Sequence, residues 1–72
     1  MKIKEILEME AEDLERMMTE EEFERMQNLG FEYTWQLLDA LQDSARESGQ
    51  DDDEEHITIS AYLDYLEDIK NA

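Results

Sequence analysis

Carboxylates dominate this chain and limit what it can fold into. Among its 72 residues are 22 Asp and Glu but only 6 Lys and Arg, which gives a formal net charge of -16. Crowded carboxylates repel one another and oppose compaction. A small domain that keeps this charge is therefore expected to carry it on its surface and to use it on a cationic partner.

Length and composition narrow the possibilities. A chain of 72 residues corresponds to one domain, residues 1–72, with a core near the lower limit for independent folding. The absence of Cys excludes disulfides, thiolate zinc sites and cysteine nucleophiles. Apolar runs are shorter than the roughly 18 residues that span a bilayer, and the first residues, MKIKE, do not form an apolar signal segment. We expect a soluble cytoplasmic protein that binds neither membranes nor nucleic acid directly, since both are anionic.

Apolar residues make up 40% of the chain and recur at helical spacing, which favours folding over disorder. The pattern predicts a first helix over residues 2–18, with an inner face of Ile3, Ile6, Leu7, Leu14, Met17 and Met18. Thr19 and Glu22 form a capping-box pattern that starts a new helical turn. This turn is expected to carry Phe23 and Met26 inward and to end at Gly30.

Two further helices are predicted in the second half. The first covers residues 33–47 and buries Thr34, Leu37, Leu38, Leu41 and Ala45. Residues 31–35 also alternate like a strand, and pairing with residues 56–59 is the local alternative. After a break at residues 48–50 and an acidic loop, Thr58 or Ser60 caps a last helix with a buried stripe of Ile59, Tyr62, Leu63, Leu66 and Ile69. The expected fold is a small all-α bundle of three to four helices.

Several segments resemble an acyl carrier protein over nearly the whole chain. Residues 55–66 read EHITISAYLDYL, which is similar to the last helix of that family, and an acidic run precedes them. Leu29-Gly30, followed by WQLLDAL at residues 35–41, is similar to the start and the apolar pattern of the family's second helix. The resemblance implies an acyl-carrier-like four-helix bundle.

The motif that carries the prosthetic group is missing. The family has Asp-Ser-Leu just after Leu-Gly, where this chain has Glu32, Tyr33 and Thr34. Tyr33 stands at the position of the phosphopantetheine-bearing serine, and Ser44 lies late in a predicted helix. We therefore expect no phosphopantetheine and no other cofactor. What the resemblance still implies is a docking face for a basic enzyme, with Glu32, Asp39 and Asp43 at matching positions.

Size and charge also resemble those of phage-encoded acidic DNA mimics, such as the inhibitor of the bacterial histone-like protein HU. Carboxylates three or four positions apart on a helix lie roughly 5–6 Å apart, a spacing comparable to that of phosphates on one strand. We therefore expect a DNA mimic that blocks a basic nucleic-acid-binding protein; the alternative is a docking or regulatory module on a basic enzyme. The candidate contacts are an N-terminal row (Glu5, Glu8, Glu12, Glu15), a middle row (Glu32, Asp39, Asp43) and an acidic loop (Asp51, Asp52, Asp53, Glu54, Glu55).

Catalytic and metal-binding interpretations are less favoured. An EF-hand starting at Asp51 would place His56 at the glycine position and Tyr62 at the bidentate glutamate. His56 has no second His or Cys and no paired serine, so a surface or capping role is expected. Carboxylate pairs arise by chance in such a sequence, and a small core is not expected to form a catalytic cleft. Tyr33 and Trp35 cannot easily both face inward, so one is expected to be an exposed anchor.

Overall fold

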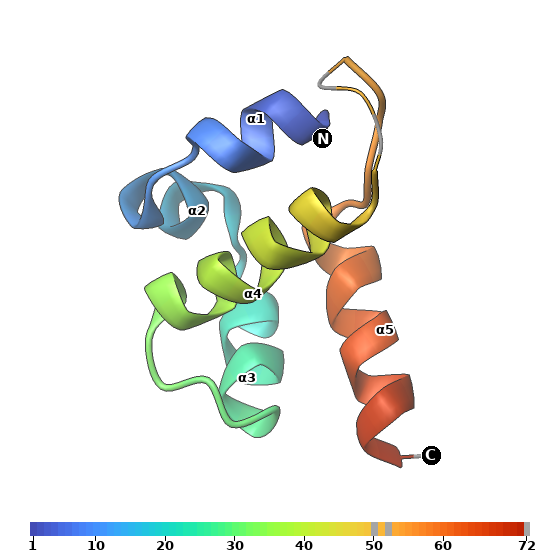
Figure 1. Cartoon of the computed structure of the whole chain (residues 1–72). Coiled ribbons are helices and arrows are strands. Elements are labelled where there is room, and N and C mark those ends of the chain that lie inside the picture. Colours follow the sequence, from blue (N-terminus) through green and yellow to red (C-terminus); the bar gives the residue numbers. More distant parts are fainter. Residues whose placement is uncertain (50, 52, 72) are drawn as a thin grey trace.

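Five helices form the described part of the chain (Figure 1). A computed structural model describes residues 1–49, 51 and 53–71. The helices are α1 (Ile3–Glu8), α2 (Ala11–Met17), α3 (Glu20–Asn28), α4 (Thr34–Glu47) and α5 (Ile59–Asn71). The fold is an all-α bundle, as predicted, and it has five helices instead of three to four.

The helix predicted over residues 2–18 is divided at Met9 and Glu10, so that prediction was wrong. Both residues have extended backbone conformations. The side-chain amide of Gln42 donates to the carbonyl oxygens of Ile6 and Met9, each at 3.1 Å, and the Asp13 carboxylate accepts the Glu10 N–H at 3.2 Å. These bonds give partners to the Met9 carbonyl and the Glu10 N–H, which the break removes from the helical hydrogen-bond pattern. The break lets α1 and α2 both pack against α4 (Figure 1).

The break also changes which side chains of the N-terminal segment are buried. Ile3 and Ile6 are buried on α1, and Leu14 and Met18, one turn apart, are buried at α2. Met17, predicted to face inward, is half exposed. A single helix would have placed it on the common apolar face, whereas α2 directs only the Leu14 and Met18 side inward.

The predicted boundaries of α3 are confirmed. The Thr19 hydroxyl accepts the Glu22 N–H at 3.3 Å, and the Glu22 carboxylate accepts the Thr19 N–H at 3.1 Å. Met26 is buried and Phe23 packs half-buried against the core. Gly30 ends the segment with a φ of 101°, in the left-handed region that favours glycine.

Helix α4 is central to the core. Its buried residues are those predicted: Thr34, Leu37, Leu38, Leu41 and Ala45. The alternative strand at residues 31–35 does not form, because α4 already includes Thr34 and Trp35. Within the described residues the β-bridge observed instead joins Lys2 to Glu55. Gly49, with a φ of 69°, follows the end of α4, and Gln50 of the predicted break lies outside the described residues.

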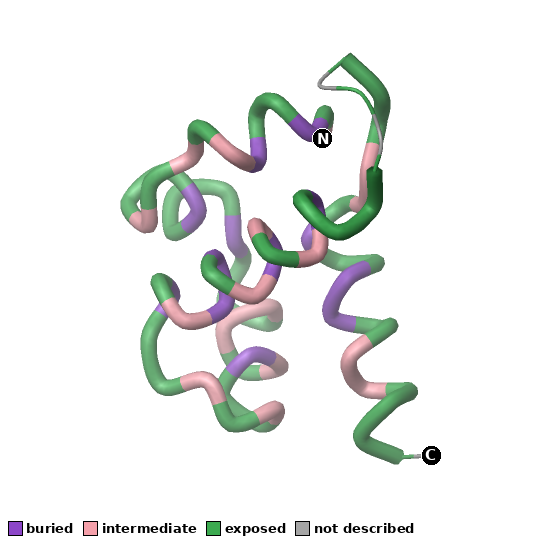
Figure 2. The backbone as a smooth tube through the Cα atoms, viewed as in Figure 1, coloured by how far each residue is buried: buried purple, intermediate pink, exposed green. Residues whose placement is uncertain are grey.

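Helix α5 packs on the bundle mainly through its first half. The Thr58 hydroxyl accepts the Ala61 N–H at 3.2 Å, so Thr58 is the cap. Ile59, Tyr62 and Leu63 are buried as predicted. Ile69 was predicted in the same stripe, but it is 54% exposed. In this part of α5 the side turned to α3 carries Glu67 and Lys70, and Ile69, two positions after Glu67, points in another direction on the helix. The last turns of α5 are largely exposed (Figure 2).

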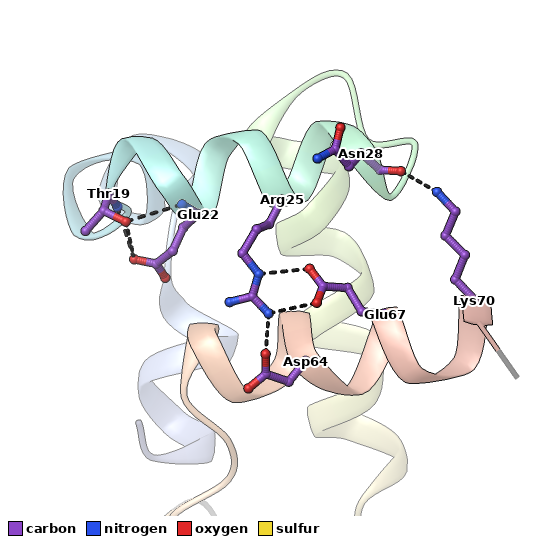
Figure 3. Close-up of polar contacts among 7 residues, drawn as sticks. All are labelled: Thr19, Glu22, Arg25, Asn28, Asp64, Glu67 and Lys70. Atoms are coloured by element: carbon purple, nitrogen blue, oxygen red, sulfur yellow. Dashed lines mark hydrogen bonds and ion pairs between the residues drawn. The ribbon is translucent and has the colours of Figure 1, made fainter.

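A cluster of ion pairs joins α3 to α5 (Figure 3). The guanidinium of Arg25 donates to both carboxylate oxygens of Glu67, at 2.8 and 3.2 Å, and also to Asp64. Next to it, the Lys70 ammonium donates to the carbonyl oxygen of Asn28. The hydrogen bonds from Arg25 lower the pKa of Glu67, and those to Glu67 and Asp64 raise the pKa of Arg25.

We expect Arg25→Gln to lower the unfolding temperature at pH 7 by several degrees, and Arg16→Gln to lower it less. Both changes remove one positive charge, but Arg16 lies 3.8 Å from its two carboxylate partners at an exposed site. Because Glu67 has a depressed folded-state pKa, its contribution is present above its ordinary pKa of about 4.5 and is lost as pH falls through the folded value. Thermal melts should therefore show the two variants converging below about pH 4.5. An Arg25→Gln deficit that persists in acid would contradict this account.

The bundle is thin, with extents of 31 × 29 × 15 Å. The smallest extent corresponds to two layers of helices, since packed helix axes lie about 8–10 Å apart. Each helix therefore keeps an exposed face (Figure 2). Among the described residues, none of the helices combines the length and the apolar character needed to cross a bilayer.

Candidate functional site

Most carboxylates of the described residues have no cationic partner. Of the 21 that the structure describes, six form ion pairs: Glu12, Asp13, Asp43, Glu55, Asp64 and Glu67. The other fifteen form none within 4.0 Å. The guanidinium of Arg25 lies between α3 and α5, where it pairs with Asp64 and Glu67. The exposed surface is therefore strongly anionic.

The N-terminal row is not continuous. Glu5 and Glu8 lie on α1, whereas Glu12 and Glu15 lie on α2, beyond the break. All four are exposed. The prediction of one carboxylate ridge along a single helix was therefore wrong; the break replaces it with two shorter pairs on helices of different direction (Figure 1).

The middle row lies at α4 and the turn before it. Asp39 and Asp43 are exposed one helical turn apart, and Asp43 accepts from Arg46 at 2.9 Å. Glu32 precedes the helix, and its N–H donates to the side-chain oxygen of Gln36 at 2.8 Å. The structure thus places these three carboxylates on one short stretch of backbone that is fixed at its start.

The acidic loop is attached to the start of the chain. The N–H of Ile3 donates to the carbonyl oxygen of Glu54 at 3.0 Å, and the N-terminal ammonium lies 3.1 Å from the Glu55 carboxylate. A turn is closed by the Glu54 N–H, which donates to the Asp51 carbonyl at 3.0 Å. Asp51, Asp53, Glu54 and Glu55 are exposed, and Asp52 lies outside the described residues. The end of the loop at Glu54 and Glu55 is therefore attached to the first residues of the chain.

His56 does have a serine partner, so the expectation of none was wrong. Ser44 Oγ lies 3.3 Å from His56 Nε2, and the His56 N–H donates to the Met1 carbonyl at 2.8 Å. The pairing depends on a turn that brings residue 56 back to the end of α4, which local spacing does not show. The Ser44–His56 contact joins α4 to the residue that follows the acidic loop. In the part of the chain that the structure describes, no cavity is found and no group of three metal-ligating side chains converges.

Two features of the surface were missed or underestimated at the level of sequence. The first turn of α3 adds exposed carboxylates at Glu20 and Glu21, and Glu24 adds another in the next turn. The capping box at Thr19 is the signal that could have revealed them, since acids favour helix N-termini. The second feature is that Tyr33 and Trp35 are both exposed, whereas only one of them was expected to be.

Comparisons of the chain with protein-family models, with curated proteins and with solved structures found no match. The resemblance to acyl carrier proteins therefore stays an expectation from sequence. In the structure, Tyr33 precedes α4 and is exposed, and Ser44 lies inside α4, half-buried beside His56.

Proposed function

We propose that this protein is an acidic DNA mimic that binds a basic nucleic-acid-binding protein and blocks its DNA site. The observation that carries the proposal is that fifteen carboxylates of the described residues form no ion pair, on a bundle only 15 Å thick. A folded protein does not need this charge, which works against its stability. The bacterial histone-like protein HU is the first partner to test.

The spacing of the carboxylates supports the proposal. Neighbouring phosphates on one strand of duplex DNA rise about 3.4 Å along the axis and also turn around it, so the distance between them is larger than this rise. Helical carboxylates three or four residues apart, such as Asp39 and Asp43, have Cβ atoms about 5–6 Å apart. Lys and Arg side chains placed for a phosphate backbone would therefore meet carboxylates at a similar spacing.

Interface size limits how much of this charge one partner can contact. The accessible surface is 4854 Å², and a typical interface covers about 800 Å² on each side, roughly a sixth of that area. Carboxylates on a face turned away from the partner would then act only through long-range attraction. The proposal thus predicts that some charge removals weaken binding much more than others.

The test is competition with labelled duplex DNA for HU, followed by fluorescence anisotropy. At about 0.1 M NaCl, where the Debye length is about 10 Å, we expect this protein to release the DNA from HU completely. Two triple variants that remove equal charge are Asp51→Asn with Asp53→Asn and Glu54→Gln, and Glu20→Gln with Glu21→Gln and Glu24→Gln. The acidic loop has the densest charge, so the first variant should release less DNA than the second.

Two results would refute the mimic. The first is a complex that contains HU, DNA and this protein together, because a mimic and DNA claim one site. That result would favour the docking-module alternative. The second is equal weakening by both triple variants, which would indicate unspecific attraction between opposite charges.

A further inference from the structure

Two aromatic side chains are exposed together where α4 begins. Tyr33 is 58% exposed and Trp35 is 54% exposed, although a small domain gains much stability by burying such rings. Their ring centroids are 6.4 Å apart, and their planes lie within 9° of parallel. We call Tyr33 and Trp35 the aromatic pair. It places two adjacent aromatic rings on a mainly anionic surface.

Local hydrogen bonds hold the aromatic pair in place. The side-chain oxygen of Gln36 accepts the N–H groups of Glu32 and Tyr33, at 2.8 and 3.0 Å. Thr34, between the two rings in sequence, is buried. Because Thr34 takes the inward position, the side chains on either side of it are directed to the surface. A pair that is ordered before binding loses less conformational entropy when a partner covers it.

Charge determines what can cover the aromatic pair. The net charge of -16 repels nucleic acid, anionic lipid and a second copy of this chain. Asp39 follows Trp35 by one helical turn, with no ion pair of its own among the described residues. An aromatic ring next to a carboxylate suits a guanidinium group, which stacks on the ring and pairs with the carboxylate at once.

We propose that the aromatic pair and Asp39 receive an arginine side chain of the basic partner. The inference rests on the proposed function only in requiring a cationic protein. A lysine ammonium pairs with a carboxylate but is a compact, strongly hydrated charge without a planar face. The surface therefore selects arginine-bearing segments over lysine-bearing segments of equal charge.

The test uses two labelled peptides of equal length, one of arginines and one of lysines, in place of the partner. Carboxylates alone favour arginine to some degree, so the informative quantity is the ratio of the two affinities. Trp35→Leu should reduce this ratio roughly two- to fivefold, and Trp35→Phe should retain most of it. Ile69→Ala is the matched control, since Ile69 is also 54% exposed, and it should leave the ratio unchanged.

Fluorescence gives a second measurement, because Trp35 is the only tryptophan. The arginine peptide should change the Trp35 emission more than the lysine peptide does. An unchanged ratio in Trp35→Leu, or equal emission changes with both peptides, would overturn the proposal. If circular dichroism shows that Trp35→Leu does not fold, Tyr33→Leu provides the comparison. If this protein does not release DNA from HU, but Trp35→Leu still lowers the arginine-to-lysine affinity ratio, the DNA mimic is refuted and the arginine site is retained.

Discussion

Replacing Leu63 with alanine is expected to remove at least about half of the free energy of unfolding at low salt. Leu63 has no exposed surface and lies in the half of α5 that packs on the bundle. Removing a buried leucine side chain costs about 2–5 kcal/mol. Domains have about 0.05–0.15 kcal/mol of stability per residue, roughly 4–11 kcal/mol for a chain of this length. Self-repulsion favours the lower end, so this one change removes about half of the stability or more.

Urea unfolding followed by far-UV circular dichroism measures this effect. Ile69→Ala, six residues further along the same helix and 54% exposed, should change the free energy of unfolding by about 0.5 kcal/mol or less. If the two variants unfold at the same urea concentration, Leu63 does not join α5 to the core as the structure shows.

The helices could be predicted where the determining contacts are local. The capping box of Thr19 and Glu22, the end at Gly30 and the buried stripe of α4 each depend on residues within a few positions. The break at Met9 could not be predicted in this way. It is stabilised by Gln42, which lies 33 and 36 residues from the carbonyl groups that it bonds. Hydrophobic spacing alone favoured a continuous helix, because Ile3, Ile6 and Leu14 follow one face.

The same distinction applies to the candidate site. Composition alone predicted an anionic surface, and it is confirmed by fifteen carboxylates that form no ion pair in the part of the chain that the structure describes. The continuity of the N-terminal row depended on the undivided helix and was lost with it. The Ser44–His56 contact and the attachment of Glu54 to Ile3 join distant parts of the chain, so no local pattern indicated them. The exposure of Trp35 was partly predictable, since Leu37 and Leu38 already occupy the inner face.

Added salt is expected to act in opposite directions on folding and on binding. From about 0.1 to 1 M NaCl the Debye length falls from about 10 to 3 Å, which screens the repulsion among carboxylates. The unfolding temperature should rise, with each kcal/mol regained corresponding to about 4–8 °C for a domain of this size. Over the same range, affinity for a basic partner should fall by roughly tenfold or more, because screening weakens attraction between opposite charges.

Thermal melts and binding titrations in the same buffers test both effects. The variant with Asp51→Asn, Asp53→Asn and Glu54→Gln carries three fewer negative charges, so salt should raise its unfolding temperature less than that of the original chain. An unfolding temperature that falls steadily with NaCl would contradict the repulsion on which the proposed function depends. A binding affinity that does not change with salt would mean that apolar contacts, such as those of the aromatic pair, dominate the interface. Together, the two measurements distinguish an interface whose affinity depends on charge from one whose affinity depends on an apolar contact surrounded by charge.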